Sequence, residues 1–227
     1  MGRLKTAFIA GTIAAITPWV ANAGIIEVRD NPDNGAGEFL DGAIDSPLIR
    51  YQGEEFNANA GVFSLQQRQS EEEFWTDFLA FCLQISQNLR LPADYEMADT
   101  DSYLGSEDVK DALGIIYGNF LTEELGLKSA QSAAAMQFLI WELIEDGFDG
   151  FDLDEGTFVV LDAEVKAEAE TLWALVLSDT FKPVDIAILS SGDSQDLLFA
   201  AVPLPGGIAL ILTGLAALRA ARRKKVA

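Results

Sequence analysis

Histidine is absent from the 227 residues of this chain. Catalytic triads and Cys–His pairs use imidazole as their base, and the usual zinc sites use it as a ligand, so we exclude both. The sequence also has no glycine-rich phosphate loop and no internal repeat, and nothing in it marks a glycosidase pair of carboxylates. We therefore expect a protein that is not an enzyme; a secreted hydrolase that uses acidic residues is the least favoured alternative.

Cysteine occurs once, at Cys82. Exported proteins usually carry cysteines in even numbers, because the oxidising compartment pairs them as disulfides. A single thiol in a chain with export signals therefore needs either a partner of another kind or an inert, buried position.

Basic residues are scarce between the two ends of the chain. Residues 24–202 hold eight of the 15 basic residues and all 36 acidic ones, a formal charge of −28. Such a surface repels nucleic acid and anionic membrane, so we expect neither as a partner. Trp75, Trp141 and Trp173 are among the aromatic residues that supply a core, and the length of this region suits a single domain.

The first 23 residues have the layout of a secretory signal peptide. Arg3 and Lys5 are followed by an apolar stretch over residues 7–16, and Ala21-Asn22-Ala23 provides a small-x-small cleavage site. The apolar stretch is too short to span a membrane as a permanent anchor. We expect cleavage before Gly24 and export of the mature chain.

Residues 202–227 have a three-part layout: a short motif, an apolar run and a basic end. Val202, Pro203, Leu204 and Pro205 precede an apolar run over 206–218 and a basic cluster over 219–225. This order resembles the VPLPA variant of PEP-CTERM sorting signals, although Gly206 stands where that variant has Ala. The resemblance implies a short hydrophobic sorting helix, transient contact with the inner membrane, processing by an exosortase-type enzyme, and the surface or extracellular matrix of a Gram-negative bacterium. The alternative is a permanent single-span anchor, whose basic end stays cytoplasmic.

The middle, residues 24–201, alternates strand and helix patterns. We predict a loop over 30–42. We predict strands over 24–29, 61–67, 78–85, 184–189 and 196–202, and helices that begin near Ser106, near Ser129 (to about Glu145) and near Asp162 (to about Leu177). The predicted fold class is α+β: a β-sandwich or barrel that carries a helical subdomain.

Gln137 falls on the apolar stripe of the second predicted helix. Met136, Ile140 and Trp141 lie on the same stripe at helical spacing. An amide buried there without partners costs about 1–3 kcal/mol, so Gln137 needs a structural or chemical reason to be in that position.

Phe81-Cys82-Leu83 and the run Met136–Trp141 resemble two motifs of the bacterial surface thioester domain family. The segment 195–198 (Gln-Asp-Leu-Leu) also resembles the end of such domains. The resemblance implies an internal thioester between the Cys82 sulfur and the Gln137 carbonyl, which reacts with amine groups on a protein or polymer and needs no cofactor. Such a bond needs a dry site, and we expect Phe81, Met136, Ile140 and Trp141 to form its apolar walls. The family commonly places an acidic residue or Asn shortly after the cysteine, whereas this chain has Gln84 and Ile85.

Two alternatives remain open at this point. The protein is otherwise a non-covalent structural or carbohydrate-binding module of a biofilm matrix, with an inert Cys82. The acidic run over residues 146–155 also offers Asp149, Asp152 and Asp154 as weak calcium ligands, although the spacing does not match an EF-hand and a solvated acidic turn is preferred.

Overall fold

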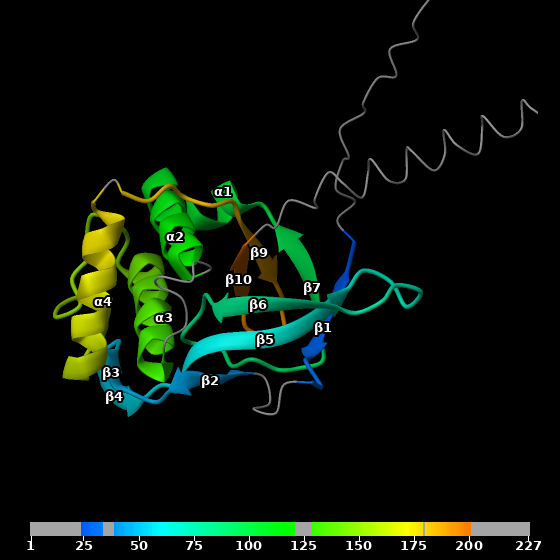
Figure 1. The fold of residues 1–227 in the computed structure, drawn as a ribbon, viewed down its shortest axis with the longest axis horizontal. Coiled ribbons are helices and arrows are strands. Elements are labelled where there is room, and N and C mark those ends of the chain that lie inside the picture. The colour runs from blue at the N-terminus through cyan, green and yellow to red at the C-terminus, as the bar shows by residue number, and fades with distance from the viewer. Residues whose placement is uncertain (1–23, 34–38, 121–128, 179, 201–227) are drawn as a thin grey trace, which may run out of the picture.

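The computed structural model describes residues 24–33, 39–120, 129–178 and 180–200 (Figure 1). The predicted signal peptide and the predicted sorting segment lie outside these ranges. Within them, no helix combines the length and the apolar character that a membrane crossing requires.

Six antiparallel strands close into a barrel. Their order around it is β1-β7-β9-β10-β6-β5, and β5 pairs back to β1, so each strand has two neighbours. Their bounds are Ile26–Asp30 for β1, Ala60–Arg68 for β5, Thr76–Cys82 for β6, Ala93–Ala98 for β7, Ile186–Ser190 for β9 and Leu197–Ala200 for β10. The predicted "sandwich or barrel" is therefore a barrel, whose closure leaves no free edge in this ring.

Strand β5 is buried on both faces over most of its length. Helix α3 packs against its first half, where β2 also pairs with its edge. Strand β2 (Phe39–Asp45) pairs with this half of β5, while β1 pairs with the second half. The two backbones come very close at Gly61, where a Cβ atom would lie 2.1 Å from the carbonyl oxygen of Ala43. Only glycine fits that approach.

The helices gather at one end of the barrel (Figure 1). They are α1 (Thr100–Leu104), α2 (Glu107–Phe120), α3 (Ala130–Glu145) and α4 (Ala163–Val176), and a small sheet of order β4-β3-β8 lies beside them. The bounds of that sheet are Leu48–Tyr51 for β3, Glu54–Asn57 for β4 and Phe158–Val160 for β8. Helix α3 is buried on every side from Ser132 to Leu143, which its apolar composition all round allows.

The predicted helices are confirmed. Two of them start at the expected residues, which cap them: Ser129 accepts from the Ser132 N–H, and Asp162 accepts from two N–H groups of the first turn of α4. The loop predicted over 30–42 is wrong at its end, where β2 begins at Phe39. Sequence analysis also missed β3, β4, β7, β8 and α1. These elements are short, and β4 exposes all its residues, so they carry little hydrophobic pattern.

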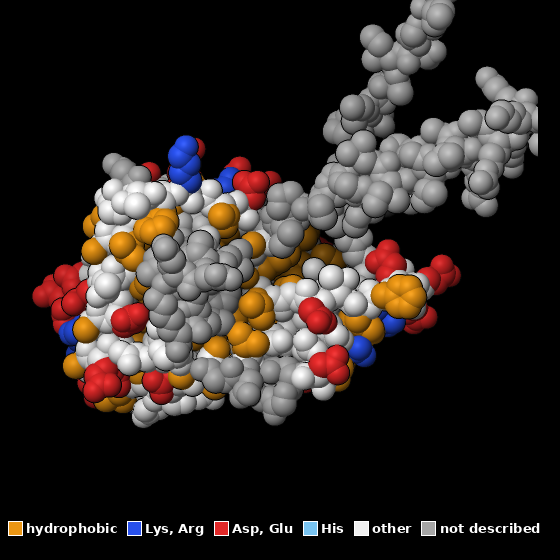
Figure 2. Space-filling model, in the orientation of Figure 1, with side chains coloured by type: hydrophobic (Ala, Val, Ile, Leu, Met, Phe, Trp, Pro, Cys, Tyr) orange, Lys and Arg blue, Asp and Glu red, His pale blue; other side chains and the backbone are white. Residues whose placement is uncertain are grey.

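Acidic side chains are spread over the face of the molecule shown in Figure 2, where basic ones are few. Glu142 on α3 is an exception, because it is fully buried. Its Oε1 accepts from the backbone N–H of Asp152 at 2.8 Å, while its Oε2 has no partner among the described residues. Burial, with lesser contributions from Asp146 and Asp152, raises the pKa of Glu142 to about 8.

We predict a stability that falls as pH rises, with Glu142 as the cause. Its folded-state pKa lies above the ordinary value of 4.5, so between pH 4.5 and about 8 the folded protein keeps a proton that the unfolded chain has lost. Folding is therefore favoured at the acid end of this range, and the contribution is lost as pH rises towards 8. Thermal unfolding of Glu142→Gln between pH 5 and 9 should show a shallower decline in Tm than the parent.

The matched control is Glu170→Gln, which changes an exposed acid on α4. It should keep the parent slope. An equal slope in the parent and in Glu142→Gln would contradict the assignment.

Candidate functional site

Cys82 and Gln137 meet at the junction of the barrel and the helices. Cys82 is the last residue of β6, and Gln137 lies in the middle of α3; both are buried. The Cys82 N–H donates to the Gln137 Oε1 at 3.0 Å, and the Gln137 Nε2 donates to the Cys82 carbonyl oxygen at 2.7 Å. The Gln137 side chain and the backbone of Cys82, 55 residues apart in sequence, are thus held together by a two-point contact, which fixes the plane of the carboxamide.

The direction of these hydrogen bonds matters for chemistry. A backbone N–H aimed at a carbonyl oxygen polarises the carbonyl and stabilises negative charge that develops on the oxygen during nucleophilic attack. Here that N–H belongs to the residue that also carries the thiol. The carboxamide therefore lies against the backbone of the residue that carries the candidate nucleophile, with one oxyanion donor already bound.

The thiol lies in a buried setting that opposes its ionisation. Burial raises the pKa of Cys82, and the side chains of Trp141 and Gln195 counter part of that rise. The Sγ atom also lies 3.8 Å from the carbonyl oxygen of Gln84. The Trp141 Nε1 is buried and has no hydrogen-bond partner among the described residues, so its N–H is available to a thiolate at Cys82.

A polar network holds the segment behind the cysteine. The Asp196 carboxylate accepts from the Ser191 N–H at 2.8 Å, the Gln84 Nε2 at 3.0 Å and the Tyr103 hydroxyl at 2.7 Å. The neighbouring Gln195 Nε2 donates a short hydrogen bond to the Gln84 carbonyl oxygen. These contacts position Gln195 against the thiol.

Gln195 and Asp196 were not predicted as site residues. The segment 195–198 stood out only through its resemblance to the end of a thioester domain. Their contacts with Gln84 span 111 and 112 positions in sequence. Two consecutive polar residues at the start of an apolar strand were the only sequence signal.

A cavity of about 470 Å³ contains both Cys82 and Gln137 in its wall. The described residues that line it are all uncharged. Besides the pair, they are Phe39, Phe56, Asn57, Ala58, Asn59, Phe63, Ile85, Gln87, Asn88, Leu89, Trp141 and Gln195. The cavity therefore leads to the point where Cys82 and Gln137 meet.

Of the four walls expected from sequence, only Trp141 lines this cavity. Phe81 points the other way, because neighbouring residues of a strand face opposite sides, and its ring meets Tyr117 of α2 edge-on at 5.8 Å. Met136 is buried towards α2 and α4, next to Ile116 and Leu172. Ile140 is buried in the core, away from the cavity lining. The aromatic walls come instead from β2, β4 and β5.

The candidate calcium ligands do not form a site. Among the described residues, no three acidic, cysteine or histidine side chains are placed to hold a metal ion. Asp154 pairs with Lys166 at 2.5 Å, and the Asp152 Oδ1 accepts from the Asp154 N–H at 2.9 Å, while Asp149 is exposed. Hydrogen bonds to α3 hold this loop in place. The Asp146 carboxylate accepts from the N–H groups of Thr157 and Phe158, and the Glu142 carboxylate accepts from the Asp152 N–H.

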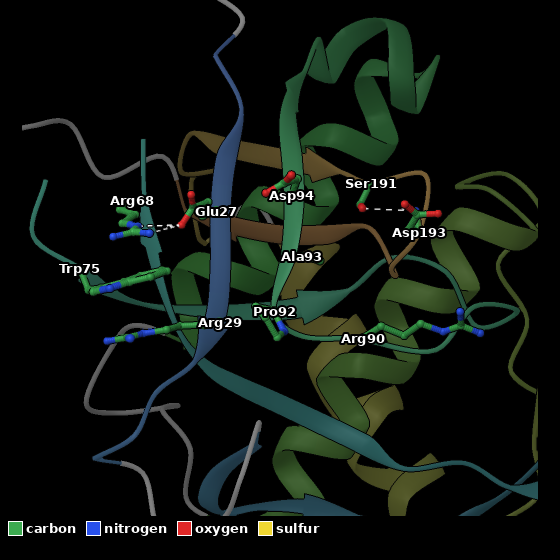
Figure 3. Close-up of a pocket in the computed structure, with 10 residues that line it drawn as sticks. All are labelled: Glu27, Arg29, Arg68, Trp75, Arg90, Pro92, Ala93, Asp94, Ser191 and Asp193. Atoms are coloured by element: carbon green, nitrogen blue, oxygen red, sulfur yellow. Dashed lines mark hydrogen bonds and ion pairs between the residues drawn. The ribbon is translucent and has the colours of Figure 1, made fainter. Parts of the chain in front are cut away.

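A second cavity, of about 740 Å³, lies on the β1–β7 side of the barrel (Figure 3). There the indole of Trp75 lies between the guanidinium groups of Arg29 and Arg68, at 4.0 and 4.6 Å from the ring centroid. Arg68 pairs with Glu27 at 2.5 Å, and Arg29 donates to the Gln66 Oε1. These cations are satisfied by neighbours, so this stack braces the β5–β6 hairpin against β1.

No family model and no curated protein matches the sequence. Among solved structures, the chain is similar to the thioester domain of the Staphylococcus aureus TIE protein, at 11% sequence identity and a TM-score of 0.43. The alignment covers 77% of this chain and 91% of that chain.

Removing the carboxamide should leave two buried backbone groups of Cys82 without partners. We predict that Gln137→Leu, made in a Cys82→Ala background so that no thiol chemistry contributes, lowers the free energy of unfolding by about 1–3 kcal/mol for each orphaned group. Urea unfolding measures the loss.

The control is Gln131→Leu in the same background. Gln131 makes one hydrogen bond at the start of α3, to the Glu164 carbonyl oxygen, and is more exposed. It should cost no more than about 1 kcal/mol. An equal decrease in the free energy of unfolding in the two variants would contradict a stabilising role for the Gln137 contact.

Proposed function

We propose that this chain is an exported surface or matrix protein whose Cys82 and Gln137 condense to an internal thioester, and that the thioester attaches the protein covalently to amine groups on a partner. One observation carries the proposal: the Gln137 carboxamide is bound at both ends to the backbone of Cys82, with an N–H on its carbonyl oxygen. Any residue other than proline at position 82 could make these two backbone contacts, so the cysteine is the feature that a purely structural role leaves unexplained.

The thioester forms when the C–N bond of the Gln137 carboxamide is exchanged for a C–S bond. The Cys82 sulfur adds to the Gln137 Cδ, and the negative charge that develops on Oε1 is stabilised by the Cys82 N–H. The Trp141 indole and the Gln195 amide favour the thiolate form of the sulfur. The thiol proton is transferred to the amide nitrogen, the C–N bond breaks, and ammonia leaves through the cavity as the C–S bond completes.

Attachment reverses the exchange with a different amine. A neutral primary amine attacks the thioester carbonyl, the C–S bond breaks, and the Cys82 sulfur takes up the proton that the amine loses. Gln137 then carries a substituted amide to the partner. Because each thioester reacts once, each protein molecule forms one covalent link to a partner. Burial of the Cys82–Gln137 pair limits competing hydrolysis of the thioester.

The ends of the chain supply the delivery route in this proposal. Residues 1–23 direct export and are removed, and residues 202–227 pass to an exosortase-type enzyme after a transient stay in the inner membrane. The formal charge of −28 over residues 24–202 attracts cationic amines to the exposed domain at long range.

The intact mass of the mature protein tests the bond. We expect a chain lighter by one ammonia than its sequence requires and without a titratable thiol after unfolding. Incubation with methylamine should add one methylamine and release one thiol. Cys82→Ala and Gln137→Ala should each show the full mass and no addition. A parent protein with full mass and one free thiol would leave the non-covalent module as the better account.

Terminal sequencing of protein from the native host tests the delivery route separately. The mature chain should begin at Gly24 and end close to Val202. Replacing Pro203 and Pro205 with alanine should leave the C-terminal segment attached and the protein in the membrane fraction. A mature protein that keeps both ends in full would contradict this part of the proposal.

A further inference from the structure

The cavity that reaches the Cys82–Gln137 pair has a composition that restricts which amine can enter. None of its described lining residues is charged, although the chain as a whole is strongly acidic. An ammonium group that enters must leave its hydration without gaining a carboxylate partner, which is costly. Only a neutral amine can attack the carbonyl carbon, and no carboxylate lines the cavity to take a proton from an ammonium group.

This requirement favours weakly basic amines over lysine. A lysine side chain with a pKa of about 10.4 is neutral in only about one molecule in 2,500 at pH 7, whereas an amine with a pKa of about 8 is neutral in about one in ten. An electron-withdrawing oxygen or carbonyl group near the nitrogen produces the second kind of amine. The long-range charge of the domain still attracts either cation to the surface before it loses its proton.

The polar lining is suited to hydroxyl groups. Gln87 and Asn88 make no side-chain hydrogen bond to other described residues. Asn57 uses only its Nδ2, on the Ser46 carbonyl oxygen, and Asn59 uses only its Oδ1, on the Ser46 hydroxyl. Donors and acceptors are therefore both free, and a hydroxyl group can use both.

Aromatic rings lie beside these amides. Phe39 and Phe63 pack together with ring centroids 4.6 Å apart, and the ring of Phe56 on the edge strand β4 is 39% exposed. A flat apolar ring next to free amides is a surface that suits a pyranose, which has an apolar C–H face and polar edges.

We propose that the nucleophile for this site is the free amino group of an amino sugar within a polysaccharide. This inference rests on the proposed thioester. The sugar nitrogen attacks the Gln137 carbonyl carbon, its proton goes to the departing Cys82 sulfur, and the polymer becomes N-acylated by the protein. Gln87, Asn88, Asn57 and Asn59 hold the sugar hydroxyls while the bond forms.

Four amines offered to the mature protein at pH 7 test the inference, with the added mass followed over time. They are methylamine, Nα-acetyl-lysine methylamide, glycinamide and a glucosamine oligosaccharide, the last three at equal total amine. Glycinamide is weakly basic but has no hydroxyls. We expect the oligosaccharide to add about tenfold faster than the lysine compound, as its larger free-base fraction outweighs its lower nucleophilicity, and several-fold faster than glycinamide.

Two failures are distinguishable. If methylamine adds nothing and the thiol is free, the thioester proposal itself is wrong. If methylamine adds normally but the lysine compound or glycinamide matches or exceeds the oligosaccharide, the thioester stands and the amino-sugar inference is overturned, in favour of a protein partner or of an unselective site.

A charge variant tests the reason for the selectivity. Asn88→Asp puts a carboxylate at the rim of the cavity, and it should raise the rate with the lysine compound relative to the oligosaccharide at least threefold. Gln69→Glu makes the same change of charge on the distant β5–β6 hairpin and should leave the ratio unchanged. An equal change in both variants would assign the effect to overall charge and contradict the role of the cavity.

Discussion

The two hydrogen bonds between the Gln137 carboxamide and the backbone of Cys82 are the constraint on which the site depends. Helix α3 is buried along most of its length and offers few polar groups to fix its position against the barrel. The carboxamide fixes that position, because both of its ends must be satisfied in a dry environment. This one contact joins the middle of α3 to the end of β6, at the residue that carries the thiol.

The same burial that orders the pair also makes the thiol a poor nucleophile at rest. A raised pKa protects Cys82 from oxidation and side reactions, but it demands donors when the sulfur must carry charge. Trp141 and Gln195 occupy those positions, and Asp196 holds Gln195 in place through Gln84. The protein combines an acidic exterior, an uncharged cavity and a buried Cys–Gln pair. In the proposed function, the exterior attracts amines, the cavity favours the neutral form of the amine, and the pair acylates it.

Elements with a long hydrophobic pattern could be predicted from the sequence, whereas contacts between residues far apart in the sequence could not. Helix α3 was predictable because a long apolar stripe follows Ser129. The strand that contains Cys82 was predictable because its run is apolar, although it ends at Cys82 and not at Ile85 as expected. The pairing of Cys82 with Gln137 came from a resemblance, since nothing local links residues 55 positions apart. Apart from Trp141, the cavity walls were not predictable, because strand alternation turned Phe81 away and because the aromatic residues that line the cavity instead come from β2, β4 and β5.

An electron-density map of the mature protein at high resolution would show whether the thioester forms. We predict continuous density from the Cys82 Sγ to the Gln137 Cδ, no density for the Gln137 Nε2, and an Oε1 that still accepts from the Cys82 N–H. Separate side chains, with a complete carboxamide on Gln137 and an unmodified thiol on Cys82 in protein never exposed to amines, would contradict it.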